Sequence, residues 1–187
     1  MVTRAIALNL WMTEVLKPDL AKKIVRLLLD AFMDTEDRRA LLSNQNKLVV
    51  VQTVIQSISR VSESSAKEYE GCKFYKETFE NPLLEKLKEH YRCEASKMLQ
   101  ELSIPQYIEK VVAKLDEESK WSAIIIPNRS TVYVKNVFME HFVQNSSMDQ
   151  ILSEGVRMIE EERVDDHDDF YKILKEILQR GKLAIIH

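Results

Sequence analysis

Glycine and cysteine are scarce in this chain of 187 residues, which contains three glycines and two cysteines. So few glycines leave little material for a phosphate-cradling loop or for the sharp turn that exposes a nucleophilic serine, and neither motif occurs. The cysteines, Cys72 and Cys93, are too few for a disulfide framework, and their spacing fits no zinc motif. We therefore expect reduced thiols and an intracellular protein of the cytoplasm, the nucleus or both.

Long apolar runs and a large excess of charge are also lacking. No run approaches the roughly 18 apolar residues that a membrane-spanning helix needs. The apolar start, residues 1–17, has no small-residue cleavage site, so we do not expect a signal peptide. The formal net charge is −3, whereas nucleic-acid-binding domains usually carry a strongly basic face. The sequence predicts neither a membrane nor a nucleic-acid partner, and its length predicts one domain or one segment of a longer rod.

Apolar residues recur at steps of three and four along the chain, as the buried face of a helix requires. The β-branched run Val49 to Val51 could suggest a strand, but the longer period around it favours a buried helix. Residues 62–71 are polar, end in Gly71 and predict a loop. The first four stripes are Ala5, Leu8, Met12 and Val15; Leu20, Ile24, Leu27, Leu28 and Ala31; Leu48, Val51, Val54, Ile55, Ile58 and Val61; and Tyr75, Phe79, Leu83, Leu87, Tyr91, Ala95, Met98 and Leu102.

Serines mark the starts of later predicted helices. Ser103 can cap one helix, with Pro105 in its first turn, and Ser130 and Ser147 can cap two more. The later stripes are Tyr107, Ile108, Val111, Val112 and Leu115; Val134, Val137, Phe138, His141 and Phe142; Met148, Ile151, Leu152, Val156 and Ile159; and Phe170, Leu174, Ile177 and Leu178. About eight helices with short connections and no convincing strand pattern predict an all-α stack of antiparallel helices.

Pro82 interrupts the longest stripe. Proline removes one helix hydrogen bond, so we expect a kink or a restart of the helix at this position. Asn81 and Pro82 would suit an N-cap followed by the first helical residue.

The acidic run from Asp165 to Asp169, with His167 at its centre, is the sharpest candidate for chemistry. Carboxylates bind hard cations and histidine binds transition metals. Neighbours on a helix point in different directions, however, and the glycine and terminal glutamate of a calcium loop are absent. The run is typical of a solvated helix start, where acidic residues favour the positive end of the dipole. One alternative remains open, a small metal-dependent helical hydrolase that uses this cluster.

Other reactive side chains give weaker signals. Glu140 and His141 have no second ligand at the spacing of a zinc-protease helix, so His141 is expected to be a partly buried helix residue. His90 is expected at the surface, and Cys93 has no histidine at a telling position. Trp11 and Trp121 could anchor a partner, although a lone tryptophan is more often part of the core. We predict no catalytic, metal-binding or cofactor-binding residue and no small-molecule substrate.

The order of residues from 75 to 118 resembles the N-terminal helical stalk of the cullins, the elongated scaffolds of multisubunit ubiquitin ligases. The first helix matches in its aromatic residues, its apolar pair and its glutamate-alanine step, and the next helix matches in a tyrosine, a lysine, a leucine and a glutamate. The matching positions are Tyr75, Phe79, Glu80, Leu83, Leu84, Tyr91, Glu94, Ala95 and Leu99, followed by Tyr107, Lys110, Leu115 and Glu118.

The resemblance extends more weakly over most of the chain. Residues 5–18, the serine-threonine pair at Ser130 and the stretch 164–174 are similar to family segments. The chain departs from the family pattern at residues 124–127. The resemblance places residues 1–34 at the end of one helical repeat or at a repeat junction, and residues 44–187 in the central repeat of a stalk segment that spans 1–187.

This placement implies a non-catalytic scaffold segment of a cullin-RING ubiquitin ligase in ubiquitin-dependent protein degradation. The segment would be a rigid spacer between the substrate adaptor and the RING subunit with its ubiquitin-loaded enzyme. Its partners would be other ligase subunits, bound mainly through parts of the scaffold that the resemblance does not cover. No adaptor-binding or RING-binding residue is implied here, and the candidate core residues are Tyr75, Phe79, Leu87, Tyr91 and Tyr107.

A helical rod of a vesicle-tethering complex is the main alternative, because such rods show similar apolar stripes. A list of bound proteins that contains ubiquitin-ligase subunits and no tethering subunits would separate the two.

Overall fold

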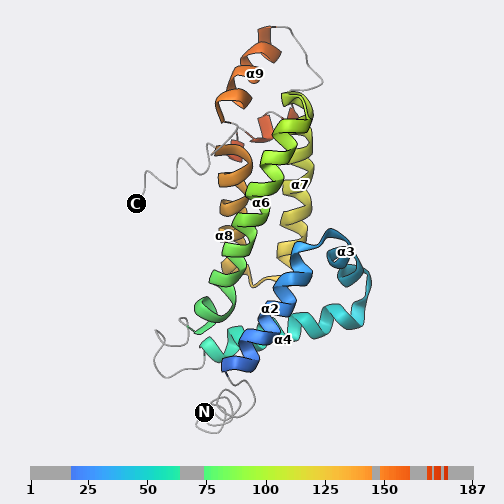
Figure 1. Ribbon diagram of the computed structural model, residues 1–187, viewed down its shortest axis with the longest axis vertical. Helices are drawn as coiled ribbons and strands as arrows, with labels where there is room; N and C mark the ends of the chain where they lie inside the picture. Colours follow the sequence, from blue (N-terminus) through green and yellow to red (C-terminus); the bar gives the residue numbers. More distant parts are fainter. Residues whose placement is uncertain are drawn as a thin grey trace. The chain divides into compact units, whose positions relative to one another are not determined.

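The computed structural model describes residues 18–63, 74–144, 148–160, 168–169, 171–173 and 175–176. Within these ranges all regular secondary structure is helical (Figure 1). The elements are α2 (Pro18–Met33), α3 (Thr35–Ser43), α4 (Gln45–Glu63), the π-helical turn η2 (Lys76–Glu80), α6 (Asn81–Glu101), α7 (Ile104–Ile125), α8 (Asn128–Met139), the π-helical turn η3 (Glu140–Gln144) and α9 (Met148–Glu160). The predicted all-α fold is confirmed, and no helix of the described part is long and apolar enough to span a membrane.

The chain forms two compact units. Unit 1 comprises Met1–Leu87 and Trp121–Val132, and unit 2 comprises Lys88–Lys120 and Tyr133–His187. Three helices, α6, α7 and α8, therefore supply residues to both units.

In unit 1, α2 buries a different face from the predicted one. The buried residues are Ala21, Val25, Leu29 and Phe32, whereas Leu20 is 46% exposed and Leu27 is 60% exposed. The expected stripe through Leu20 and Leu27 is therefore wrong as a description of the core of unit 1. Helix α2 has apolar residues on two adjacent faces, whereas a surface helix needs only one apolar face. The helical spacing in the sequence therefore fits both faces, and the prediction chose the face next to the buried one.

The contacts around Trp121 explain this register in α2. Phe32 packs edge-on against Trp121 with 5.2 Å between ring centroids. The guanidinium of Arg38, in α3, lies 4.4 Å from the centroid of the same indole ring, and its Nε donates a hydrogen bond to the carbonyl of Phe32. Trp121 is thus a core residue, 3% exposed, as the sequence favoured.

Helix α4 confirms the helical interpretation of the β-branched run. Leu48, Ile55 and Ile58 are buried, while Val49 and Val50 are exposed by 47% and 61%. The preceding helix, α3, was not predicted, and Asp34 caps it by accepting a hydrogen bond from the amide of Asp37.

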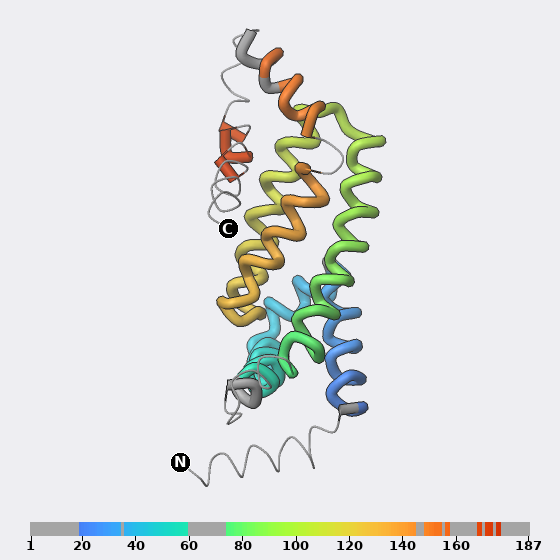
Figure 2. The backbone as a smooth tube through the Cα atoms, turned by 90° about the vertical axis from the view of Figure 1, so that its left-hand side faces the viewer, coloured from blue at the N-terminus to red at the C-terminus, as the bar shows by residue number. Residues whose placement is uncertain are grey.

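In unit 2, segments of α6, α7 and α8 lie side by side (Figure 1 and Figure 2), and aromatic side chains of α6, α8 and η3 contact one another. Phe138 and Phe142 stack with their ring centroids 4.5 Å apart, and Tyr91 lies 5.3 Å and 5.6 Å from them. The hydroxyl of Tyr107 donates a 2.6 Å hydrogen bond to the carbonyl of Phe142. Most residues of the predicted stripes of α6, α7 and α8 are buried as expected, whereas Leu102 and His141 are only partly buried.

The start of α7 follows the prediction. Ser103 precedes the helix, and both its amide and its hydroxyl donate to the side-chain oxygen of Gln106, at 3.2 Å and 3.1 Å. The bond from the Ser103 amide to the Gln106 side chain is one half of the capping box that serine followed three residues later by glutamine can form.

The described part of α9 and of the C-terminal region differs from the predicted stripes. In α9, Ile151 is buried, but Leu152 and Val156 are 42% and 57% exposed, so their predicted inward orientation is wrong. Ile173, which the sequence did not single out, is fully buried.

Several predictions concern residues outside the described ranges. They are the stripe Ala5, Leu8, Met12 and Val15, the loop ending at Gly71, the cap at Ser147, and the apolar residues Phe170, Leu174, Ile177 and Leu178. The predicted division into 1–34 and 44–187 also stays a prediction.

Candidate functional site

A buried hydrogen-bonded group in the described part of unit 1 joins the turns before α6 to the start of α8. Tyr75 and Glu80 come from the turns before α6, and Ser130 comes from the first turn of α8. Ser130 donates its hydroxyl proton to a carboxylate oxygen of Glu80. It therefore accepts from the Tyr75 hydroxyl, which lies 2.9 Å from its Oγ. All three residues are at most 4% exposed, so the hydrogen bonds replace the water that they lose.

Arg129 covers this group and connects it to α4. Its guanidinium carbon lies 4.3 Å from the centroid of the Tyr75 ring, within the range of a cation–π contact. Its Nη2 donates to the hydroxyl of Ser59 at 3.1 Å. Ser59, in α4, is 7% exposed. The four side chains around Tyr75 form what we call the Tyr75 cluster: Ser59, Glu80, Arg129 and Ser130.

A π-helical turn brings Glu80 into this cluster. In η2 the amide of Asn81 donates to the carbonyl of Lys76, five residues earlier, and consecutive residues Phe79 and Glu80 are both buried. Pro82 has no amide proton to continue an ordinary ladder, and its ring crowds the preceding turn, so a wider turn before it relieves both problems. The expected N-cap at Asn81 is wrong, because its φ and ψ are −62° and −48°, which are helical.

Ser130 is likewise not the N-cap that the sequence suggested. Helix α8 begins at Asn128, and the amide of Ser130 donates to the carbonyl of Pro127 at 2.8 Å. The serine is thus inside the first turn, where its side chain points into the core rather than back to the backbone. Sequence alone does not separate these roles, because serine is frequent in both.

Burial raises the pKa of Tyr75 to about 12. The hydrogen bond to Ser130 opposes this effect, the nearby Glu80 carboxylate adds to it, and Arg129 opposes it. The phenol is therefore neutral and a donor at physiological pH. The polar atoms of the Tyr75 cluster hydrogen-bond to one another. The cluster therefore holds the helical segments that carry these residues in place.

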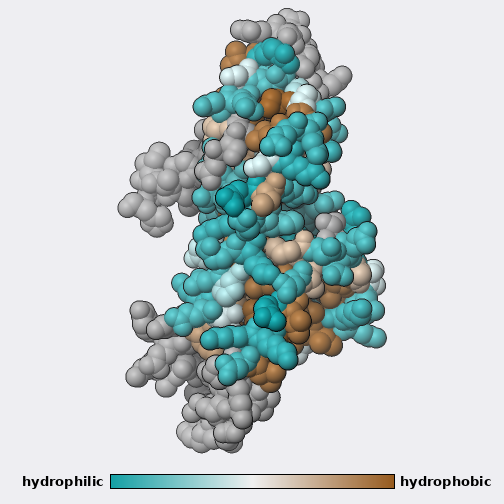
Figure 3. All heavy atoms as spheres, viewed as in Figure 1, coloured by the Kyte–Doolittle hydropathy of each residue, from teal (hydrophilic) through white to brown (hydrophobic). Residues whose placement is uncertain are grey.

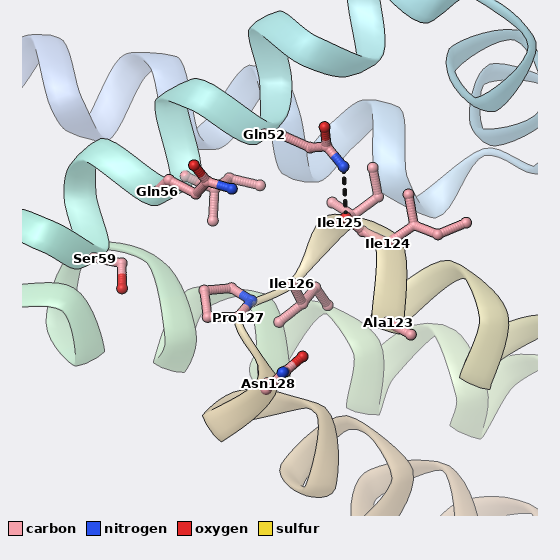
Figure 4. Close-up of a pocket in the computed structure, with 10 residues that line it drawn as sticks. Gln52, Gln56, Ser59, Ala123, Ile124, Ile125, Ile126, Pro127 and Asn128 are labelled. Atoms are coloured by element: carbon pink, nitrogen blue, oxygen red, sulfur yellow. Dashed lines mark hydrogen bonds between the residues drawn. The ribbon is translucent and has the colours of Figure 1, made fainter.

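A hollow of 340 Å³ lies beside the cluster, between α4 and the connection from α7 to α8. Its lining residues are Gln52, Ile55, Gln56, Ser59, Ala123, Ile124, Ile125, Ile126, Pro127 and Asn128 (Figure 4). The amide nitrogen of Gln52 donates to the carbonyl of Ile124 at 2.9 Å and so binds one of the last carbonyls of α7. Amides, one hydroxyl and aliphatic side chains line the hollow, and no charged side chain is among them.

The acidic run at 165–169 remains untested as a metal site. Only Asp168 and Asp169 of the run are described. Among the described residues, no group of three or more histidine, cysteine, aspartate or glutamate side chains could hold an ion.

The remaining candidates lie in unit 2. His141 is partly buried in η3, as expected, whereas His90 is only partly exposed and lies 3.7 Å from the carboxylate of Glu94. Cys93 is an exposed free thiol whose sulfur lies 3.5 Å from Glu89. A hydrogen bond from Arg92 lowers the pKa of the Glu89 carboxyl. Trp11 lies outside the described ranges.

Sequence comparison places this helical chain in a family. The family model for the cullin α-solenoid domain matches residues 2–186. The chain belongs to the cullin family. Cullin-2 of Caenorhabditis elegans is 25% identical over 183 residues, which cover 92% of this chain and 22% of that protein. Cullin-3 of Dictyostelium discoideum is 26% identical over 106 residues, which cover 55% of this chain and 14% of that protein.

The match of this cullin chain thus covers about a fifth of the length of Cullin-2 and about a seventh of the length of Cullin-3. The predicted family and the helical-repeat fold are confirmed. The match also puts the Tyr75 cluster inside the cullin solenoid domain. Sequence reasoning selected Tyr75, Phe79 and Glu80 as family positions, but it missed that Glu80 points inward. Pro82, two residues after Glu80, is the sequence feature that indicated an irregular turn at this place.

Proposed function

We propose that this chain is a non-catalytic scaffold segment of a cullin-RING ubiquitin ligase. Its role is to separate the substrate adaptor from the RING subunit and its ubiquitin-loaded enzyme. The observation that carries the proposal is the match of the cullin α-solenoid model to residues 2–186. The proposal includes protein partners from the ligase and a location in the cytoplasm, the nucleus or both.

A spacer acts by holding two partners at a favourable separation. A linker of matched length raises the effective concentration of one partner near the other. A flexible linker lowers this concentration, because the tethered partner then samples a larger volume. The residues that resist deformation are the aromatic cluster of unit 2 and the Tyr75 cluster of unit 1. The proposal requires that α6, α7 and α8, which contribute to both units, limit bending between them.

A chimaeric ligase tests this function. The segment of a complete cullin that aligns with residues 2–186 would be replaced by this chain, and transfer of ubiquitin to an adaptor-bound substrate would be measured with purified components. We expect the chimaera to retain most of the transfer rate, because a spacer needs its fold and length rather than particular surface residues.

The control is the same cullin with a flexible glycine-serine linker of equal contour length. It should bind adaptor and RING subunit normally but transfer ubiquitin more slowly. Equal rates for the linker and the folded segment would contradict the spacer role. Affinity purification of the tagged chain gives an independent check, since recovery of vesicle-tethering subunits without ligase subunits would overturn the assignment to a ligase.

A further inference from the structure

The last turn of α7 lacks the basic side chain that commonly balances a helix C-terminus. The carbonyls at this end of a helix carry a partial negative charge, which lysine or arginine stabilises. All residues of this turn are described, and none of them is basic. The amide of Ile126 pairs with the carbonyl of Ser122, but the next carbonyl, that of Ala123, would need an amide hydrogen at residue 127, which is a proline. The end of α7 therefore offers an acceptor that the helix itself does not satisfy.

The C-terminus of α2 shows how the same chain balances such an end. There the guanidinium of Arg38, in α3, donates through its Nε to the carbonyl of Phe32, in the last turn of α2. At the end of α7 the neutral side-chain amide of Gln52 donates to the carbonyl of Ile124 instead. The negative end of α7 is thus capped without the positive charge that the end of α2 receives.

The hollow beside the end of α7 has room for such a charge. All of its lining residues belong to unit 1, and its 340 Å³ is near the lower limit of the about 300–1,000 Å³ of ligand pockets, so it suits a single side chain. Gln56 and Asn128 contribute side-chain oxygens, and isoleucines form the apolar wall. Figure 4 shows Ser59, which binds Arg129, on the opposite side of the hollow from Ile124. The existing cation is therefore held away from the end of α7.

We propose that this hollow receives an arginine side chain of a partner protein. The aliphatic stem of arginine can lie along the isoleucines, and its planar guanidinium can donate to several oxygens at once, which a lysine ammonium does less well. That the occupant belongs to a protein rests on the proposed scaffold function. The amides of Gln56 and Asn128 can hydrogen-bond the main chain on either side of the arginine.

A titration of the ¹⁵N-labelled full chain tests the site. The probes are the peptide acetyl-Ala-Arg-Ala-amide and the same peptide with citrulline, which replaces the guanidinium by a neutral urea group of the same shape. We expect the arginine peptide to shift the amide signals of residues 52–59 and 123–128 saturably. The citrulline peptide should bind at least about fivefold more weakly, because it carries no charge for the helix end. Equal affinities for the two peptides would overturn the proposal.

Two lysine variants separate this site from general attraction of a basic peptide. Hydrophilic side chains cover much of the face of the molecule seen in Figure 3, so a control for such attraction is needed. Gln56→Lys puts a positive charge at an exposed position of the lining and should weaken binding at least about fivefold. Thr53→Lys adds the same charge at an exposed position of α4 outside the lining and should leave the affinity unchanged. Circular dichroism should show the helical content of the parent in both variants, and equal weakening by both would contradict a site in the hollow.

Ethylguanidinium distinguishes a protein partner from a free small molecule. It carries the charged group without a peptide, so we expect weaker binding than for the arginine peptide, and equal affinity would overturn the assignment to a partner protein. These titrations use the chain without ligase subunits. Their failure would leave the chimaera result standing, and failure of the chimaera would not change the measured peptide affinities.

Discussion

Units 1 and 2 share one backbone feature but differ in the polarity of the side chains that it buries. Each contains a π-helical turn that buries two consecutive side chains, Phe79 and Glu80 in η2 and Phe142 and Val143 in η3. In unit 1 one of the two is a carboxylate, which needs hydrogen-bond donors inside the protein. In unit 2 both are apolar.

The two turns therefore depend on different partners. Glu80 accepts from Ser130, which in turn accepts from Tyr75, so one small hydroxyl connects two groups. The hydroxyl of Tyr107 donates to a main-chain carbonyl of η3, and the buried side chains of this turn stabilise it by filling volume. We expect unit 1 to be sensitive to loss of a hydrogen bond and to alkaline pH, and unit 2 to loss of volume.

The largest expected effect is the loss of an aromatic ring in unit 2. Phe142 is fully buried and lies against Phe138 and Tyr91, so Phe142→Ala should lower the free energy of unfolding by about 3–5 kcal/mol. Urea denaturation followed by circular dichroism measures it. Tyr133→Ala, at a 45% exposed position of α8, is the control and should change stability far less. Equal losses would mean that the aromatic cluster does not stabilise unit 2.

A smaller loss is expected from one hydroxyl in unit 1. Ser130→Ala leaves the buried Glu80 carboxylate and the Tyr75 hydroxyl without their shared partner, and the cost should be about 1–3 kcal/mol. Ser43→Ala is the matched control, because Ser43 is exposed and its hydroxyl binds only the carbonyl of Ala40. An unchanged denaturation midpoint for Ser130→Ala would remove the proposed contrast between the units.

Alkaline pH should weaken unit 1 through Tyr75. Its pKa is raised from the ordinary 10.0 to about 12, so its contribution to stability is complete below pH 10 and is lost as pH rises from 10 towards 12. The loss from Tyr75 alone should reach about 1.4 kcal/mol at about pH 11. Unfolding free energies of the parent and of Tyr75→Phe are compared across this range. Parallel curves for the two proteins would contradict the role of the buried phenol.

The smallest effect is expected for an ion pair at the edge of unit 2. Lys114 Nζ lies 2.6 Å from a carboxylate oxygen of Glu94, and the two side chains are 33% and 29% exposed. Lys114→Ala should cost at most about 1 kcal/mol because solvent screens such pairs. The difference should shrink further in high salt, as measured by thermal unfolding with and without added sodium chloride. A larger loss of stability that does not depend on salt would contradict this. It would indicate that the Lys114 side chain stabilises unit 2 through its packing contacts and not through the ion pair with Glu94.

The long stripe from Tyr75 to Met98 was predictable because its apolar residues repeat at helical spacing and every one of them is buried. The register of α2 was not predictable in the same way, since its apolar residues occupy two adjacent faces. Contacts with Trp121, about ninety positions away in the sequence, decide which face enters the core.

The Tyr75 cluster was predictable only in part. Tyr75 was expected in the core, but Glu80 enters it through a π-helical turn, and no single-residue propensity predicts where such a turn forms. Ser130 was assigned to a helix cap because serine is frequent there, yet its partner, Glu80, lies 50 positions away. Long-range polar pairs of this kind leave no periodic signal in the sequence.

The central claim, that the segment is a stiff spacer, is tested most directly by a distance distribution between two spin labels. One label is placed at Lys47→Cys in unit 1 and the other at Glu109→Cys in unit 2, with the native cysteines replaced by serine. Labels at Lys22→Cys and Lys47→Cys, both in unit 1, give the width expected within one folded body. The account predicts a single distribution as narrow as this reference for the pair across the units, and a much broader or multiple distribution would contradict it.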